Sequence, residues 1–296
     1  MVEYLANVLC VQASPRKKGY TAKLLDTAIK GIKSVNDVEC DLIHLRDYLP
    51  IHPCTSCWNC VKNKNSCILN DSMGKNGNGE LFQKLCKANA LFISHPVYYG
   101  RPPAGLHLFF ERFYPFMWSG LLNGMPFASI SQAANNGGAR TAQIDITRWA
   151  ITFNLRITGG LPVHMVSIDE AIIHAEKLGK KIAEEALADS MERRRVTPVE
   201  RYLVSYDGQW SRLESSLMDM TNGTMQYEDS LIAYALHHSS MKNENSAKLL
   251  HKAGEELKLS LSHYKNDELT SAAEHMVKMS SFWSPTTLSK FLPNIL

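Results

Sequence analysis

LANVLCVQASPRKKGYT occupies residues 5–21 of a 296-residue chain. Its first part, Leu5–Ala13, is a short and mostly apolar run that ends at Ser14-Pro15, which predicts a buried strand. The residues that follow are polar, and Thr21–Val35 then carries apolar side chains at the spacing of one helix face. The stretch is therefore predicted to form a strand, a polar loop and the start of a helix.

The same alternation of strand and helix continues to about residue 190. Further strands are predicted at 39–45, 90–95, 126–132 and 163–168, and helices at 80–87, 104–118, 139–155 and 169–189. Strands that alternate with helices indicate a parallel sheet covered on both faces. The predicted fold class is thus α/β, with a doubly wound five-stranded parallel sheet. Such sheets bind ligands at the carboxyl ends of their strands, so the loops after the strands are the places to look for function.

Beyond this region the character of the chain changes. Residues 191–200 are charged and include Pro198, which predicts a linker. A short strand is expected at Tyr202–Tyr206, followed by helices at about 211–220, 228–240, 245–264 and 267–280. The expected organisation is a domain over 1–190 with a cysteine-rich insertion at about 46–79, a linker over 191–200, and a mainly helical region over 201–296.

Composition narrows the function classes. The formal net charge of +3 is too small to indicate a nucleic-acid partner. No stretch approaches the roughly 18 apolar residues that a membrane span needs, and the first residues do not follow the pattern of a signal peptide. We therefore expect a cytoplasmic protein that binds neither nucleic acid nor membrane. In a reducing compartment its seven cysteines are expected to be thiols or metal ligands.

The loop after the first strand has the features of an anion site. It leads into a helix N-terminus, where unpaired backbone N–H groups and the helix dipole favour a negative charge. Ser14, Arg16 and Thr21 add hydroxyl and guanidinium donors suited to a phosphate, and Gly19 permits a tight turn. The stretch contains neither a Gly-Lys-Ser/Thr motif nor G-x-G-x-x-G.

Two more loops fall at predicted strand ends. Pro96-Val97-Tyr98-Tyr99-Gly100 supplies two aromatic rings and a glycine, which could flank a planar ligand while backbone groups bond its edge. Residues 133–138, after the fourth strand, form a polar loop that contains glycine.

Four cysteines are concentrated in the predicted insertion, at Cys54, Cys57, Cys60 and Cys67. Closely spaced thiolates on a loop can converge on one iron–sulfur cluster or one zinc ion. Zinc sites usually combine two separated pairs, whereas a tight C-x2-C-x2-C run is typical of ferredoxin-type cluster loops. From the residues alone, a cluster, a zinc ion and no metal remain three alternatives.

Together, S-P-R-x-x-G-x-T, P-V-Y-x-G and the compact cysteine run resemble the NAD(P)H-dependent FMN reductase group of flavodoxin-like proteins, in its iron–sulfur flavoprotein branch. The sequence departs from the group's pattern at Gln12, Tyr20 and His95. The resemblance implies cofactor contacts and cluster ligands at the matching positions. The FMN phosphate would be held by Ser14, Arg16, Gly19 and Thr21, the flavin ring by Pro96, Val97, Tyr98, Tyr99 and Gly100, the ring edge by Gln132, Asn135 and Gly137, and a [4Fe-4S] cluster by Cys54, Cys57, Cys60 and Cys67.

The same resemblance implies an oxidoreductase. Electrons would pass from NAD(P)H as co-substrate, or from a reduced carrier such as ferredoxin, through FMN and the cluster to a small acceptor such as a quinone, a nitro compound or an oxygen species. It also implies a homodimer or homotetramer. No residue has a clear claim to be a general acid or base. Two alternatives stay open: an electron carrier without a substrate of its own, and a zinc-stabilised nucleotide-binding module.

Overall fold

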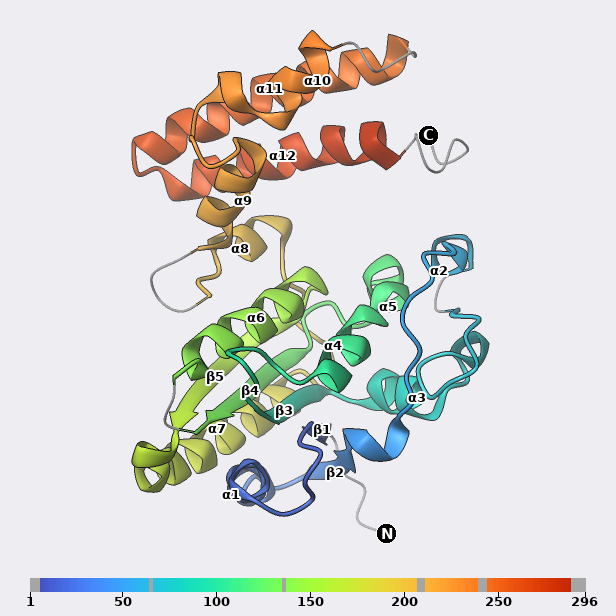
Figure 1. Cartoon of the computed structure of the whole chain (residues 1–296), viewed down its shortest axis with the longest axis vertical. Helices are drawn as coiled ribbons and strands as arrows, with labels where there is room; N and C mark the ends of the chain where they lie inside the picture. Colours follow the sequence, from blue (N-terminus) through green and yellow to red (C-terminus); the bar gives the residue numbers. More distant parts are fainter. Residues whose placement is uncertain (1–5, 64–65, 135–136, 207–210, 239–243, 289–296) are drawn as a thin grey trace. The chain divides into compact units, whose positions relative to one another are not determined.

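A computed structural model describes residues 6–63, 66–134, 137–206, 211–238 and 244–288 (Figure 1). The chain divides into two compact units, Met1–Val196 and Thr197–Leu296, which are taken separately below. Among the described residues, no helix is both long enough and apolar enough to span a membrane.

The first unit is built on five parallel strands. They are β1 (Ala6–Gln12), β2 (Val38–His44), β3 (Ala90–Pro96), β4 (Pro126–Ala133) and β5 (Arg156–His164), in the spatial order β2-β1-β3-β4-β5. This is the flavodoxin-like order, in which the direction of winding reverses between β1 and β3. The predicted fold class is therefore confirmed, and the reversal marks the edge of the sheet where a ligand is expected.

Helices cover both faces of the sheet (Figure 1). One face carries α1 (Tyr20–Lys33) and α7 (Ile168–Ala188). The other carries α3 (Glu80–Lys87), α4 (Ala104–Glu111), α5 (Tyr114–Ser119) and α6 (Ala139–Thr152). Successive residues of β1 point to opposite faces, so Val8 packs in the α1 and α7 core while Leu9 packs in the other. Both are fully buried, as expected for a strand inside a parallel sheet.

The fifth strand lies earlier than predicted. The sequence indicated 163–168, whereas β5 covers Arg156–His164 and is followed by a 3-10 turn, η3 (Met165–Ser167). The prediction was wrong because Gly159, Gly160 and Pro162 read as a loop. At the edge of the sheet a proline is tolerated, since its missing N–H faces away from the neighbouring strand.

The single helix predicted at 104–118 is in fact two. Helix α4 ends at Glu111, and α5 begins at Tyr114 with Pro115 in its first turn. A proline within a helix lacks the required N–H and clashes with the carbonyl four residues earlier, so the helix breaks just before it. Arg112 lies at this break, with its side chain buried.

The segment between β2 and α3 carries the cysteines and has little regular structure. It contains η1 (Leu45–Tyr48), α2 (Asn59–Lys62) and η2 (Lys75–Gly77). Its loops are anchored by polar contacts to Asp71, whose carboxylate accepts from the backbone N–H groups of His52, at 2.9 Å, and Met73, at 3.0 Å.

The second unit is helical in its described part and has its own core. Its elements are α8 (Pro198–Leu203), α9 (Arg212–Met220), η4 (Tyr227–Asp229), α10 (Leu231–His237), α11 (Glu244–Lys265) and α12 (Leu269–Leu288). The strand predicted at Tyr202–Tyr206 is wrong, because α8 begins at Pro198 and runs to Leu203. Thr197 and Glu200 form a reciprocal capping box that fixes this helix start inside the stretch expected to be a linker.

Candidate functional site

A pocket of about 490 Å³ opens at the carboxyl ends of the strands beside the winding reversal, a size suited to a small-molecule cofactor. Its walls come from the loops after β1, β3 and β4 and from the turn after β5. The lining residues are Ser14, Arg16, Lys18, Gly19, Tyr20, Thr21, Pro96, Val97, Tyr98, Gln132, Ala134 and Met165. Eight of the twelve predicted cofactor residues thus lie around one pocket.

Hydrogen bonds hold the loop after β1 in a fixed shape. The Gln12 side chain donates to the Arg16 carbonyl at 2.7 Å, and the Ser14 hydroxyl accepts from the Arg16 N–H at 3.1 Å. The Thr21 hydroxyl lies 3.2 Å from the Gln132 side-chain oxygen and donates to it, which joins the start of α1 to the end of β4.

The same loop leaves backbone donors at the pocket. Helix α1 begins at Tyr20 after Gly19, and this N-cap residue has no side chain that could cap the first N–H groups. Those donors, together with the cations of Arg16 and Lys18, line the same pocket. Uncapped N–H groups at a helix N-terminus beside two cations are chemically suited to hold a phosphate.

The loop after β3 is a tight turn. The backbone groups of Tyr98 and Arg101 bond each other in both directions, at 2.9 and 3.0 Å, so Tyr99 and Gly100 form the tip. Tyr98 lines the pocket, whereas Tyr99 has a positive φ of 52° and a fully exposed side chain. Of the two aromatic residues expected to flank a ring, the structure therefore brings only Tyr98 to the pocket.

Gln132 at the end of β4 and Ala134 just after the strand contribute to the pocket wall. Gly137 does not line it, and Asn135 lies outside the described residues. Gly138 instead meets the tip of the neighbouring turn, where a Cβ added at Gly138 would lie 2.8 Å from the Cα of Gly100. The two loops therefore pack together through glycine backbone.

This contact predicts different outcomes for two adjacent glycines. Both have left-handed φ values, 83° at Gly137 and 88° at Gly138, but a Cβ at Gly137 would meet no atom of the described residues within 4 Å. We expect Gly137→Ala to lower the free energy of unfolding by about 1 kcal/mol through backbone strain alone. Gly138→Ala should lower it by a further ~1–3 kcal/mol, because it also forces the two loops apart. Urea unfolding of both variants checks this, and equal losses would contradict the close contact.

Four lining residues were not predicted from the sequence: Lys18, Tyr20, Ala134 and Met165. Lys18 was recognisable as a cation beside Arg16 in the same loop. Met165 was hidden by the misplaced fifth strand, which put it inside the strand rather than just beyond its end.

His95 directly precedes Pro96 at the end of β3, and its side chain is completely buried. Its Nδ1 lies 2.9 Å from the Pro96 carbonyl and its Nε2 lies 2.8 Å from the Ser131 hydroxyl. Ser131 lies in turn 3.0 Å from the side-chain oxygen of Gln143 on α6. Burial lowers the pKa of His95 to about 4, and the Pro96 hydrogen bond only partly opposes this effect. His95 is therefore a neutral structural group whose contacts join β3, β4 and α6 next to the loop after β3.

The lowered pKa predicts how stability changes with pH. A histidine in the unfolded chain takes up a proton near pH 6.5, whereas His95 in the folded protein stays neutral down to about pH 4. Because only the unfolded chain takes up this proton between the two values, the free energy of unfolding is highest above about pH 6.5. It falls by up to ~3 kcal/mol as the pH decreases through this window. We expect His95→Gln to lose less stability than wild type between pH 7 and pH 4.5 in urea unfolding. Identical pH dependence of the two proteins would contradict the assignment.

A second pocket lies in the insertion, and all four cysteines of the C-x2-C-x2-C-x6-C run line it, together with Glu111 and Arg112. Burial raises the pKa of Cys60, and the neighbouring cysteine side chains of Cys54, Cys67 and Cys57 raise it further. The predicted ligands are therefore neighbours in space. In the described part of the chain, however, no three His, Cys, Asp or Glu side chains converge in an arrangement that could hold a metal ion.

The donor set around this pocket fits a thiophilic metal centre. Four thiols from one loop are the ligands that a [4Fe-4S] cluster or a tetrahedral zinc ion requires. Such sites are rarely preformed before the metal binds, because binding itself orders the ligands. The pocket is compatible with either centre.

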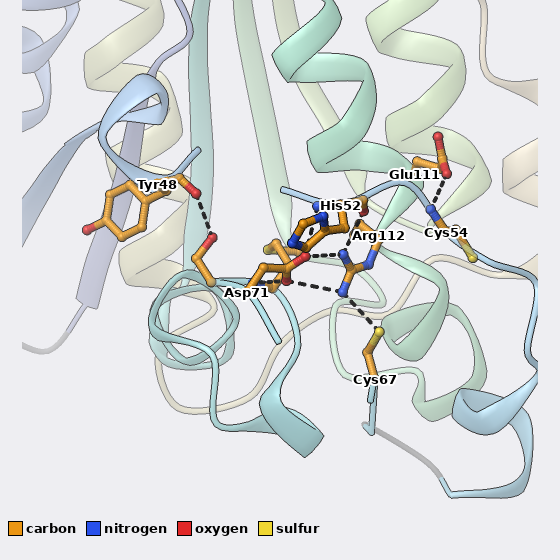
Figure 2. Close-up of polar contacts among 9 residues, drawn as sticks. Tyr48, His52, Cys54, Cys67, Asp71, Glu111 and Arg112 are labelled. Carbon is orange, nitrogen blue, oxygen red and sulfur yellow. Dashed lines mark hydrogen bonds and ion pairs between the residues drawn. The ribbon is translucent and has the colours of Figure 1, made fainter. Parts of the chain in front are cut away.

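Residues at the end of α4 form hydrogen bonds to the first and the last cysteine of the run, as Figure 2 shows. The Glu111 carboxylate accepts from the Cys54 backbone N–H at 2.5 Å, and an Arg112 N–H group donates to the Cys67 sulfur at 2.9 Å. Arg112 also pairs with Asp71 at 2.5 Å, with both side chains almost completely buried. These roles were not predicted, although a lone arginine in an aromatic-rich helix was a signal available in the sequence.

Both charges of this buried pair are maintained by their partners. Burial would raise the pKa of Asp71, but hydrogen bonds from Arg112 and from backbone N–H groups bring it below its ordinary value. Burial would likewise lower the pKa of Arg112, but Asp71 and Cys67 raise it on balance. Arg112 therefore places a permanent positive charge beside the cysteine pocket.

Comparison with known proteins gives a consistent result. The family model described as NADPH-dependent FMN reductase matches residues 6–161, more than half of the chain. An iron-sulfur flavoprotein of Archaeoglobus fulgidus is 29% identical over 179 residues, which cover 59% of this chain and 77% of that protein. One from Methanocaldococcus jannaschii is 26% identical over 192 residues, covering 60% and 95%. Among solved structures, a flavone reductase is similar with a TM-score of 0.47 and 19% identity, covering 65% of this chain and 67% of that chain.

Proposed function

Since the chain belongs to the NADPH-dependent FMN reductase family, as its resemblance implied, we propose that it is an FMN-dependent oxidoreductase with a [4Fe-4S] cluster. Electrons would come from NADH, NADPH or a reduced carrier and would leave to a small acceptor such as a quinone, a nitro compound or an oxygen species. The observation that carries the proposal is the single pocket formed by the loops after β1, β3 and β4, where three sequence-predicted contact segments meet.

The residues around this pocket have distinct tasks in the proposal. The uncapped N-terminus of α1, with Arg16 and Lys18, binds the phosphate. Tyr98 and Val97 contact the flavin ring, and Gln132 orients its edge. When bound, FMN accepts a hydride as an electron pair and releases electrons singly, and a cluster accepts them one at a time.

A structural link between the two pockets supports their joint use. Helix α4 begins just beyond the Tyr98–Arg101 turn and ends at Glu111, which contacts Cys54. Its eight residues span about 12 Å. One short helix therefore joins the loop that lines the first pocket to a residue that lines the cysteine pocket. That the relatives in Archaeoglobus and Methanocaldococcus are iron-sulfur flavoproteins is consistent with this pairing.

Anaerobic purification and a visible spectrum test the proposal. Flavin bands together with a broad shoulder that dithionite bleaches, and iron and sulfide bound with FMN, are the expected results. Zinc without iron would show that the cysteines hold a structural zinc ion instead of a cluster. A colourless protein would overturn the proposal. Steady-state oxidation of NADH and NADPH, with quinones, nitroaromatics or oxygen as acceptor, then distinguishes an enzyme from an electron carrier that turns over none of them.

A further inference from the structure

Arg112 is completely buried, which is unusual for a charged side chain and requires a full set of partners. Its two terminal nitrogens carry four N–H donors, and each donor has an acceptor. One nitrogen bonds Asp71 at 2.5 Å and the His52 carbonyl at 2.8 Å, and the other bonds Asp71 at 3.2 Å and the Cys67 sulfur at 2.9 Å (Figure 2).

Asp71 explains the burial of the charge, but it does not explain the contact with Cys67. The paired carboxylate already neutralises the guanidinium, and a neutral thiol is only a weak acceptor. A metal-bound thiolate carries negative charge and is a much better acceptor for an N–H donor. The fourth donor of Arg112 is thus aimed at a sulfur that gains most from it when it is a ligand.

We propose that Arg112 is a positioning residue that raises the reduction potential of the cluster held by Cys54, Cys57, Cys60 and Cys67. This inference rests on the cluster in the proposed function. Reduction adds one electron and one negative charge to the cluster, with no bond made or broken and no proton taken up. The N–H···S hydrogen bond from Arg112 to Cys67 stabilises the reduced state more than the oxidised one, because the sulfur carries more negative charge after reduction.

Two geometric features make this arginine specific for the task. A lysine has no planar fork and could not bond Asp71 through two donors while reaching His52 and Cys67. The fit is close, since a Cβ added at Gly74 would lie 3.1 Å from the guanidinium nitrogen that contacts Cys67. Because Glu111, the preceding residue, accepts from the Cys54 N–H, the same helix end also orients the first cysteine of the run.

The test is a potentiometric titration of the anaerobically purified holoprotein, followed by electron paramagnetic resonance of the reduced cluster. Arg112→Lys keeps a positive charge but loses the fork. Because Asp71 would be left buried and unpaired by neutralising Arg112 alone, the second variant is Asp71→Asn with Arg112→Gln. We expect both to shift the midpoint to a more negative value, the double variant by at least a tenfold change in the one-electron equilibrium constant, about 59 mV.

Arg156 provides a matched control. Like Arg112 it forms ion pairs with carboxylates, in its case two, Glu185 at 2.9 Å and Asp189 at 2.5 Å, but it lies on β5 and does not line the cysteine pocket. Arg156→Lys should leave the midpoint unchanged. Arg112 variants that retain iron and sulfide with an unchanged midpoint would overturn the inference and leave the proposed function intact. A wild-type protein that holds FMN but neither iron nor sulfide would overturn both the cluster and this inference.

Discussion

Replacing Cys60 with serine is expected to remove most of the bound iron while leaving FMN in place. Cys60 is the third cysteine of the run and lines the pocket that all four share. Structural zinc sites with four ligands gain about 10–16 kcal/mol on metal binding, so each thiolate ligand matters greatly at such sites. By analogy, the loss of one of four cluster ligands should lower iron and sulfide per chain by at least tenfold. The flavin pocket uses none of these cysteines, so its occupancy should not change. Iron, sulfide and flavin analysis of the anaerobically purified protein measures all three.

Cys86→Ser is the appropriate control for this substitution. Cys86 lies on α3, is exposed and does not line the cysteine pocket, so its loss should leave iron and sulfide at the wild-type level. If the Cys60 and Cys86 variants retained equal amounts of iron, the four-cysteine assignment would fail. If the wild-type protein held zinc and the Cys60 variant lost it, the four cysteines would remain the ligands and the metal would be zinc instead of iron.

Much of the first unit could be predicted from local pattern. Strands such as 90–95 are short apolar runs bounded by polar residues or proline, and α1 shows a clear one-sided apolar face. The exceptions have local causes. Gly159, Gly160 and Pro162 conceal an edge strand, and Pro115 divides a continuous apolar pattern into two helices.

The flavin-type pocket was predictable for a different reason. In a parallel sheet the carboxyl ends of neighbouring strands meet at one edge, so loops after β1, β3 and β4 must converge once the strand order is known. The positions of individual side chains within the loops were less predictable. Tyr98 and Tyr99 are adjacent in the sequence, yet the turn brings one to the pocket and exposes the other.

The contacts within the charged network around the cysteines could not be read from the sequence, although Arg112 itself stood out as a lone arginine in an aromatic-rich helix. Arg112 and Cys67 are 45 residues apart, and Asp71 lies in a polar stretch where a solvated carboxylate is the ordinary expectation. The structure is needed to see that Arg112, at the break between α4 and α5, is buried against the insertion. Long-range pairing of a buried charge depends on tertiary structure, which no local periodicity reports.

An Arg16→Ala variant is expected to lose affinity for FMN but not for riboflavin. Arg16 lines the pocket beside the uncapped start of α1, where the phosphate is proposed to bind, and riboflavin has no phosphate. A hydrogen bond to a charged group contributes about 1.5–3 kcal/mol, so the dissociation constant for FMN should rise ~10- to 100-fold. Fluorescence titration of the apoprotein with both flavins measures the two affinities in one experiment.

Lys17 in the same loop separates a local phosphate contact from a general effect of positive charge. Its ammonium pairs with Asp47 at 2.7 Å and does not line the pocket, so Lys17→Ala should leave the affinity for FMN nearly unchanged. Because both substitutions remove one positive charge from one loop, long-range attraction of the phosphate would weaken equally in both. Equal losses would therefore assign the preference for FMN to the overall field of the loop, whereas a loss confined to Arg16→Ala, with riboflavin binding intact, locates the phosphate at the N-terminus of α1.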